Sequence, residues 1–107
     1  MSLPFQYVVV HRSAAALPGV LACQAIHAAT ECLRRLPVSN ETHVGVLVAE
    51  KSEDLEKLSE VLTMRGIHHV LIREPDPPYN GAATAVGVEP QDRRAIRHLF
   101  EHFKALR

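Results

Sequence analysis

Hydrophobic positions along the chain follow two spacings, and the two alternate. Continuous apolar stretches rich in valine and isoleucine predict strands at 5–12, 42–49, 67–74 and 82–88. Apolar residues at helical spacing predict a helix over 18–36, with Pro18 in its first turn, and a second helix from an N-cap at Ser52 to Gly66. A third helix is expected to start at Pro90 and to bury one side, made by Ile96, Leu99, Phe100, Phe103 and Leu106.

The order of these elements, β-α-β-α-β-β-α, indicates an α/β fold. Strands of near-continuous apolar character are typical of a sheet covered on both faces, so we expect three layers, α/β/α. Right-handed helical crossovers join the first three strands, which are therefore expected to be parallel. The fourth strand follows through the short proline-rich loop 75–81 and is expected to be antiparallel. The sequence thus predicts a four-stranded mixed sheet in one domain, 1–107.

The composition narrows the class of protein. Of 107 residues, 47% are hydrophobic, and 12 basic residues balance 12 acidic ones, so the formal net charge is zero. This balance argues against a generic nucleic-acid binder, although it allows a locally basic face. No apolar run reaches the roughly 18 residues of a membrane span. Cys23 and Cys32 would lie about 13 Å apart in the first helix, too far for a disulfide, and two free thiols fit a reducing, cytoplasmic location.

The first predicted helix has two possible interpretations. On a helical wheel its apolar residues fall in one arc and its polar residues fall opposite, which favours a solvated polar face with His27 and Glu31 paired one turn apart. The alternative is that Gln24 and His27 line a site. The apolar arc is made by Leu21, Ala25, Ile26, Ala29, Cys32, Leu33 and Leu36, and the polar arc by Gln24, His27, Thr30, Glu31, Arg34 and Arg35.

The ends of the first and third strands give an independent reason to expect a site. In open α/β sheets, ligands bind beyond the carboxyl ends of the parallel strands. The first predicted helix begins beside those ends near Gly19, with free amides and a positive dipole end. The alternative is that strand ends are polar only because the chain leaves the core there. The two polar clusters, which should emerge at one edge of the sheet, are His11-Arg12-Ser13 and Arg73-Glu74.

One further pattern lies near the end of the chain. His98, Glu101 and His102 fit H-x-x-E-H, which is typical of some zinc hydrolases. A catalytic zinc needs a third protein ligand, and the phenylalanines of this segment commit it to the core. We therefore expect no metal site here.

The stretch PGVLACQAIHAATECL, followed downstream by VLIRE and AVGVEP, resembles the peptidyl-tRNA hydrolases of the archaeal and eukaryotic type. The likeness covers nearly the full chain in order and spacing, and it is closest to the divergent peptidyl-tRNA hydrolase domain-containing proteins. The matching positions are Gly19, Ala22, Gln24, His27, Ala28 and Ala29, then Leu71-Ile72 and Gly87-Val88-Glu89-Pro90.

The resemblance implies a mixed sheet between helices and a cofactor-free enzyme that hydrolyses the ester joining a peptide to tRNA. It implies that Gln24 and His27 shape the site, that Glu74 activates water, and that Arg12 and Arg73 handle charge. Phosphate contact needs clustered positive charge, which the basic last segment offers, although a solvated helix is the simpler interpretation. The candidates for tRNA contact are His11, Ser13, Gly19, Arg73, Arg93 and Arg97.

The sequence departs from the family's pattern in the predicted site. The family's lysine, four residues before the glutamine, is replaced by Val20, its loop aspartate by Glu74, and its loop motif by PDPPYNG. Hydrolysis of N-blocked aminoacyl-tRNA or peptidyl-tRNA is our first hypothesis. A tRNA- or protein-binding module on the same fold, without the chemistry, is the second. A homodimer whose alanine-rich helix face serves assembly is the third.

Overall fold

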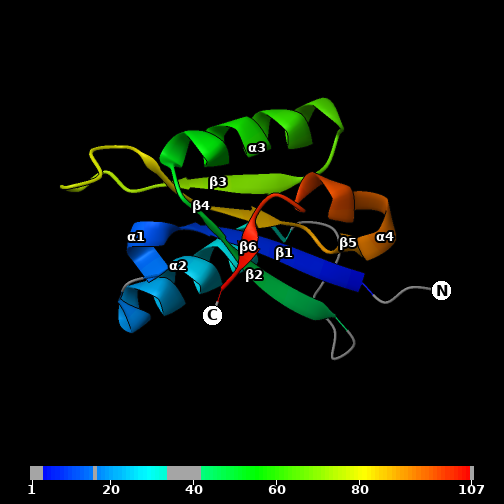
Figure 1. The fold of residues 1–107 in the computed structure, drawn as a ribbon, viewed down its shortest axis with the longest axis horizontal. Coiled ribbons are helices and arrows are strands. Elements are labelled where there is room, and N and C mark those ends of the chain that lie inside the picture. The colour runs from blue at the N-terminus through cyan, green and yellow to red at the C-terminus, as the bar shows by residue number, and fades with distance from the viewer. Residues whose placement is uncertain (1–3, 16, 34–41, 107) are drawn as a thin grey trace.

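The computed structural model describes residues 4–15, 17–33 and 42–106, which form a mixed sheet with helices packed on both of its faces (Figure 1). The strands and helices alternate over the first two-thirds of the chain, as predicted. The strands are β1 (Pro4–His11), β2 (His43–Ala49), β3 (His69–Arg73), β4 (Ala83–Val88), β5 (Gln91–Asp92) and β6 (Lys104–Ala105). The helices are α1 (Arg12–Ala15), α2 (Pro18–Glu31), α3 (Ser52–Met64), α4 (Arg93–Ile96) and the 3-10 turn η1 (Arg97–Leu99).

The sheet has the order β3-β4-β1-β2-β6, and β5 pairs with the start of β1. β1 and β2 pair in parallel, from Phe5 opposite His43 to His11 opposite Ala49. β4 is antiparallel to both of its neighbours, so β3 runs in the same direction as β1 and β2. The predicted directions of the first four strands are therefore confirmed, and all three parallel strands end at one edge of the sheet.

Two hydrophobic clusters, one on each face, hold the layers together. On one face, α2 packs through Ala28 against Val8, Val10 and Ala85. On the other face, α3 packs through Leu55, Leu58 and Leu62 against a cluster that also holds Tyr7, Val9 and Phe100. The predicted α/β class with both faces covered is confirmed.

Close packing of α2 on the sheet depends on Gly87. A Cβ atom built at Gly87 would lie 1.9 Å from the carbonyl oxygen of Ala28, a distance at which something must shift. The missing side chain of Gly87 and the small one of Ala28 therefore let the helix backbone touch β4. This contact sets the height of α2 over the sheet.

The predicted helix from Pro90 to Leu106 is wrong. The chain forms α4 and η1 and then turns into β6, so the sheet has six strands among the described residues rather than the predicted four. Phe100 and Phe103 are buried as expected, because a tight turn keeps them on one side as well as a helix does. The free edge of β2 offers hydrogen-bonding groups that the end of the chain pairs with. β6 pairs with Leu47 and Val48, and the amide of Leu106 donates to the carbonyl of Val46 at 2.9 Å.

Two predictions about the longer helices also need correction. Ile26, which the wheel placed in the buried arc, is 65% exposed. Leu21, Ala25 and Cys32 of that arc are buried or partly buried as expected, and Ala28 joins them. Helix α2 ends at Glu31, and the residues 34–36 of the predicted helix lie outside the described residues. Ser52 is not the N-cap of α3: Lys51 holds that position without a side-chain bond, and the Ser52 hydroxyl donates to the carbonyl of Ala83 at 3.0 Å.

Both cysteines are free, with Cys23 exposed and Cys32 buried. Burial raises the pKa of the Cys32 thiol, and the Gln6 side chain, which donates to its sulfur at 3.3 Å, opposes that shift. Within the described ranges, no helix has both the length and the apolar character needed to cross a membrane.

Candidate functional site

The carboxyl ends of β1, β2 and β3 bring several of the predicted site residues to one edge of the sheet, which we term the carboxyl edge. Here His11 ends β1, and Arg12 and Ser13 follow in α1. The Nδ1 atom of His11 lies 2.7 Å from the Ser13 hydroxyl and accepts from the Ser13 amide at 3.1 Å. The Ser13 hydroxyl also lies 2.9 Å from the hydroxyl of Tyr79, in the loop between β3 and β4. This contact joins the end of β1 to the loop that begins at Glu74.

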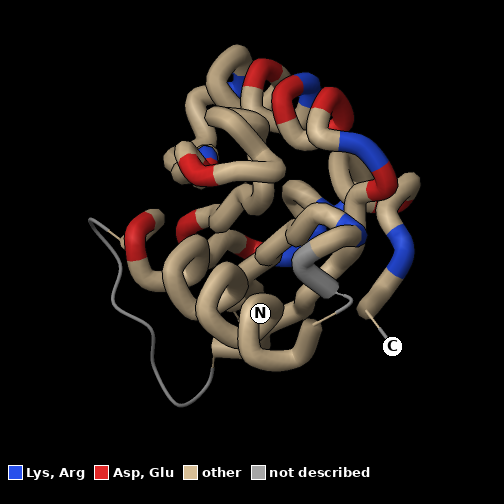
Figure 2. The backbone as a smooth tube through the Cα atoms, turned by 90° about the vertical axis from the view of Figure 1, so that its left-hand side faces the viewer, with Lys and Arg blue, Asp and Glu red and all other residues tan. Residues whose placement is uncertain are grey.

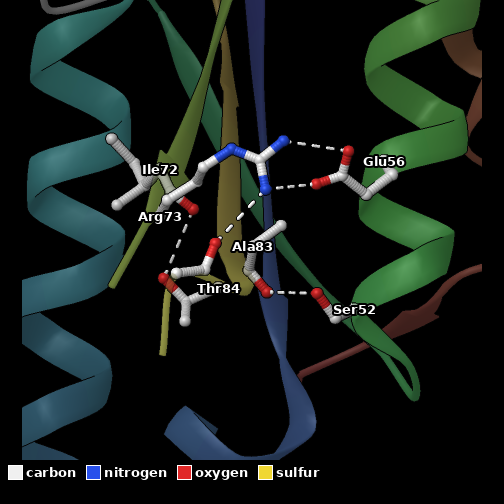
Figure 3. Close-up of polar contacts among 7 residues, drawn as sticks. Ser52, Glu56, Ile72, Arg73, Ala83 and Thr84 are labelled. Atoms are coloured by element: carbon white, nitrogen blue, oxygen red, sulfur yellow. Dashed lines mark hydrogen bonds and ion pairs between the residues drawn. The ribbon is translucent and has the colours of Figure 1, made fainter. Parts of the chain in front are cut away.

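Gln24 faces the sheet rather than solvent. It is half-buried in α2, and its Oε1 atom accepts a hydrogen bond from the hydroxyl of Thr84 at 3.0 Å. Thr84 stands near the start of β4, between β1 and β3, and its hydroxyl also approaches the Ile72 carbonyl at 3.5 Å (Figure 3). Val20 precedes Gln24 by one helical turn on the same row and is 39% exposed. The first turn of α2 is therefore exposed to solvent next to the position where Gln24 is fixed.

Thr84 is a site residue that the sequence analysis missed. A signal was present, because Thr84 is the one hydroxyl-bearing residue in the stretch AATAVGV. It is 1% exposed, and a buried hydroxyl needs a partner. The search for a partner of that hydroxyl would have led to the neighbouring strand or to Gln24.

Glu74 begins the loop that replaces the family's loop motif. Its amide and carbonyl close the base of the loop, by bonds to the carbonyl of Ala82 at 3.2 Å and to the amide of Gly81 at 2.7 Å. Glu74 is partly buried as a residue, and the Oε1 atom of its carboxylate accepts from the Asp76 amide at 3.2 Å in an exposed contact. Within the described part of the chain, its Oε2 atom has no hydrogen bond or ion pair. One oxygen is thus fixed by the loop while the other is available as a base.

The two arginines of the carboxyl edge are both paired. Arg12 makes a two-pronged contact with Glu50, which follows β2, and this pairing lowers the pKa of the Glu50 carboxyl and raises that of the Arg12 guanidinium. Arg73 makes a two-pronged contact with Glu56 of α3, with Nη1–Oε1 at 2.6 Å and Nη2–Oε2 at 3.0 Å (Figure 3). Arg73 therefore reaches toward α3, on the other face of the sheet from Gln24.

His27 and Gly19 lie on the outer side of α2. The Nε2 atom of His27 is 3.6 Å from the carboxylate of Glu31, one turn further along, and both side chains are more than half exposed. A Cβ atom at Gly19 would have nothing within 4 Å, so that position is open to solvent. Figure 2 views the molecule from the side that is on the left in Figure 1. Charged residues of both signs gather along α3 at the top, while Glu31 is the only charged residue of α2. The α2 side of the edge thus has little charge.

Arg93 and Arg97 lie at the other end of the molecule, where α4 follows β5 (Figure 1). They border a cavity of about 290 Å³, which we term the distal cavity, and which is lined by Tyr7, Leu47, Arg93, Arg97, Phe100 and Glu101. The structure therefore does not bring these two arginines to the carboxyl edge. His98 and His102 lie in this region too, but without the continuous helix that would place them one turn apart on the same face.

Comparison with known proteins identifies the family of the chain. The model of the family described as peptidyl-tRNA hydrolase PTH2 matches residues 5–106, which is nearly the whole chain. No curated protein matches the chain significantly. The matched range contains β1 from its second residue, β2 through β6, and every residue of the carboxyl edge. The chain therefore belongs to the peptidyl-tRNA hydrolase PTH2 family.

Proposed function

We propose that this protein hydrolyses the ester of N-blocked aminoacyl-tRNA or peptidyl-tRNA at the carboxyl edge. Membership of the family supports an activity of the peptidyl-tRNA hydrolase kind. The observation that carries the proposal is the bond between Thr84 and Gln24. It orients a polar amide from α2 at the edge where the Glu74 carboxylate begins its loop.

The Thr84 bond determines which end of the Gln24 amide is available. Since the Thr84 hydroxyl donates to Oε1, the NH₂ group of Gln24 is left to donate to a ligand. An ester carbonyl acquires negative charge on its oxygen when water attacks it, and an amide donor placed in advance stabilises that charge. Gln24 is therefore proposed to bind the carbonyl oxygen of the ester, and Thr84 to position Gln24.

Glu74 is proposed to be the general base. Its free Oε2 atom takes a proton from water, and the water oxygen attacks the carbonyl carbon. The bond to the 3′-oxygen of tRNA then breaks, and that oxygen takes up the proton. The bond from the Asp76 amide holds the carboxylate while this happens.

A hydrolysis assay on purified protein with N-blocked aminoacyl-tRNA tests this proposal. Glu74→Gln should lower kcat by roughly a hundredfold or more, because general-base catalysis contributes about 10²–10⁴. Glu60→Gln is the matched control: Glu60 is exposed on α3, and its variant should keep the parent rate. Release no faster than the spontaneous rate, beside an active enzyme of the family, would contradict the proposal. Binding of tRNA without release would then favour a binding module.

Val20→Lys tests whether the missing lysine limits the rate. The position is partly exposed and one turn before Gln24, so a lysine there keeps its ammonium group in water and places it beside the Gln24 amide. We expect kcat to rise, by at least severalfold. Ile26→Lys adds the same charge to the outer side of α2 and should change the rate little. Equal rates for the parent and both variants would show that the lysine is not what limits this enzyme.

A further inference from the structure

We propose that the distal cavity is a ribonucleotide subsite, which holds one phosphate and its ribose from an RNA strand bound to the protein. The inference extends the proposed function, because it assigns part of a long RNA substrate to a surface away from the reacting ester. The cavity opens between η1 and the sheet, on the face that α3 also covers.

The wall of the cavity is an ordered aromatic row. Tyr7 and Phe100 stack with ring centroids 4.1 Å apart, and Phe5 lies 4.6 Å from Tyr7 on its other side. Gly45 of β2 makes room for this row, since a Cβ atom there would meet the Phe5 ring at 2.8 Å. The guanidinium of Arg93 lies over Phe5, 4.8 Å from the ring centroid. A cation held on an aromatic face keeps its N–H groups at the rim free to donate.

Two charged side chains at the cavity have no partner among the described residues. The side chains of Arg97 and Glu101, four residues apart in sequence, make no hydrogen bond or ion pair there. Tyr7 is only 6% exposed as a residue, but its hydroxyl is not among the fully buried polar atoms of the described residues, and it makes no hydrogen bond there. An accessible hydroxyl without a protein partner is able to donate to a ligand. A ligand that enters the cavity would supply the partner.

The kinds of groups present select a ribonucleotide. Two guanidinium groups and a phenolic hydroxyl are donors that suit a phosphate. The Glu101 carboxylate repels a phosphate but accepts a hydrogen bond from a ribose hydroxyl, as acidic residues in dinucleotide sites do. The 2′-hydroxyl is the group by which a protein distinguishes RNA from DNA. At about 290 Å³ the cavity is at the small end of ligand sites, so we assign it a single nucleotide unit.

Only a long ligand can occupy both the distal cavity and the carboxyl edge. In Figure 1, α4 and the start of β1 lie at one end of the molecule, while α1 and the loop after β3 lie at the other. The molecule is 43 Å long on its longest axis. A free nucleotide cannot reach both regions, whereas an RNA strand or stem can.

Fluorescence anisotropy with a labelled single-stranded RNA 12-mer, and with the DNA oligomer of the same sequence, tests the proposal without any hydrolysis. Arg97→Ala should weaken RNA binding by roughly fivefold or more and reduce the slope of log K against log salt by about 0.7. Arg94→Ala is the matched control, because Arg94 is exposed in the adjoining helix α4 but does not line the cavity. Glu101→Gln should bring the RNA and DNA affinities together, and Tyr7→Phe should weaken RNA binding without changing the aromatic stack.

Equal losses for Arg97→Ala and Arg94→Ala would overturn the proposal, since binding would then follow net charge alone. Equal affinities of the parent protein for RNA and DNA would overturn it as well, and so would equally tight binding of a polyglutamate peptide. The assay is independent of catalysis. If the protein binds RNA through Arg97 but does not hydrolyse the ester, only the proposed hydrolysis is refuted. If it hydrolyses the ester but Arg97→Ala leaves its RNA affinity unchanged, only the subsite is refuted.

Discussion

The carboxyl edge and the distal cavity differ in how their polar groups are satisfied. At the carboxyl edge, Arg12, Ser13 and Gln24 each bond to a partner that comes from a different element. Around the distal cavity, the charges of Arg97 and Glu101 have no partner within the described residues. Bonds within the protein fix the positions of groups, as a reacting centre requires. Groups left without partners next to an apolar wall are available to a ligand. The comparison therefore separates a region that positions groups from a region that receives them.

Gly87→Ala should have the largest effect, and of the two regions it should change the geometry of the carboxyl edge. The new methyl group would lie 1.9 Å from the Ala28 carbonyl oxygen, so α2 must move away from β4. We expect unfolding to become easier by about 3 kcal/mol, the upper part of the usual range for overpacking. The same movement should separate Gln24 from Thr84 and lower the rate of ester hydrolysis. Urea denaturation and the hydrolysis assay measure the two effects.

Gly19→Ala is the control for that variant, because its methyl group would meet nothing within 4 Å. It should be neutral or should stabilise by up to about 1 kcal/mol, as alanine does in place of a helical glycine. RNA binding at the distal cavity should survive in the Gly87 variant whenever the protein is folded. Equal stability of the two variants would show that α2 does not rest on β4 as described.

Thr84→Val should have the next largest effect. It keeps the shape of the side chain and removes the donor to Gln24, so a half-buried amide loses its partner, at a cost of about 1–3 kcal/mol in the free energy of unfolding. The rate should fall with it, because Gln24 can then turn. Thr84→Ser, which keeps the hydroxyl, should recover most of the rate. A loss of stability without any change in rate would remove Gln24 from the site.

The strands of the sheet were predictable because their apolar character is local. The segments of β1, β2 and β4 are mostly apolar, and burial on both faces favours this whatever their neighbours are. The direction of β3 followed from chain connections alone. The gathering of His11 and Glu74 at one edge followed from the same rule, because parallel strands end together. These features need no knowledge of which side chains meet.

The errors concern features that depend on distant parts of the chain. The wheel placed Gln24 outward and Ile26 inward, since it could not show that Gly87 draws the helix down at Ala28. The last helix was expected because Phe100 and Phe103 have helical spacing, whereas the free edge of β2 takes that segment as β6. The partners of Arg12 and Arg73 are 38 and 17 residues away in sequence, so the pattern showed charges but not that they are paired.

Tyr79→Phe and Tyr7→Phe each remove one hydroxyl oxygen, the first at the carboxyl edge and the second at the distal cavity, so their effects on stability can be compared. Tyr79 loses its bond to the Ser13 hydroxyl, which is exposed, so we expect a loss of about 0.5–1 kcal/mol in stability and a lower kcat as the loop loosens. Tyr7 loses a hydroxyl that has no partner in the described residues, so its variant should be as stable as the parent or slightly more stable. Thermal melts measure both. Destabilisation by Tyr7→Phe would mean that its hydroxyl is already satisfied within the protein.

The smallest expected effect on stability comes from the ion pair between Arg12 and Glu50, and it is measured through the dependence of stability on pH. The pair lowers the pKa of Glu50 in the folded protein below its ordinary value of 4.5, so the unfolded chain takes up the proton first as the pH falls. The stabilisation is therefore complete above pH 4.5 or so and is lost as the pH falls through the lower, folded pKa. Both side chains are exposed, so salt should weaken the effect. Melting temperatures between pH 3 and pH 6, in the range where carboxylates titrate, should fall less steeply for Glu50→Gln than for the parent. An acid limb as steep for Glu50→Gln as for the parent would show that the pair does not fix charge at the carboxyl edge, which would remove the distinction between the two regions.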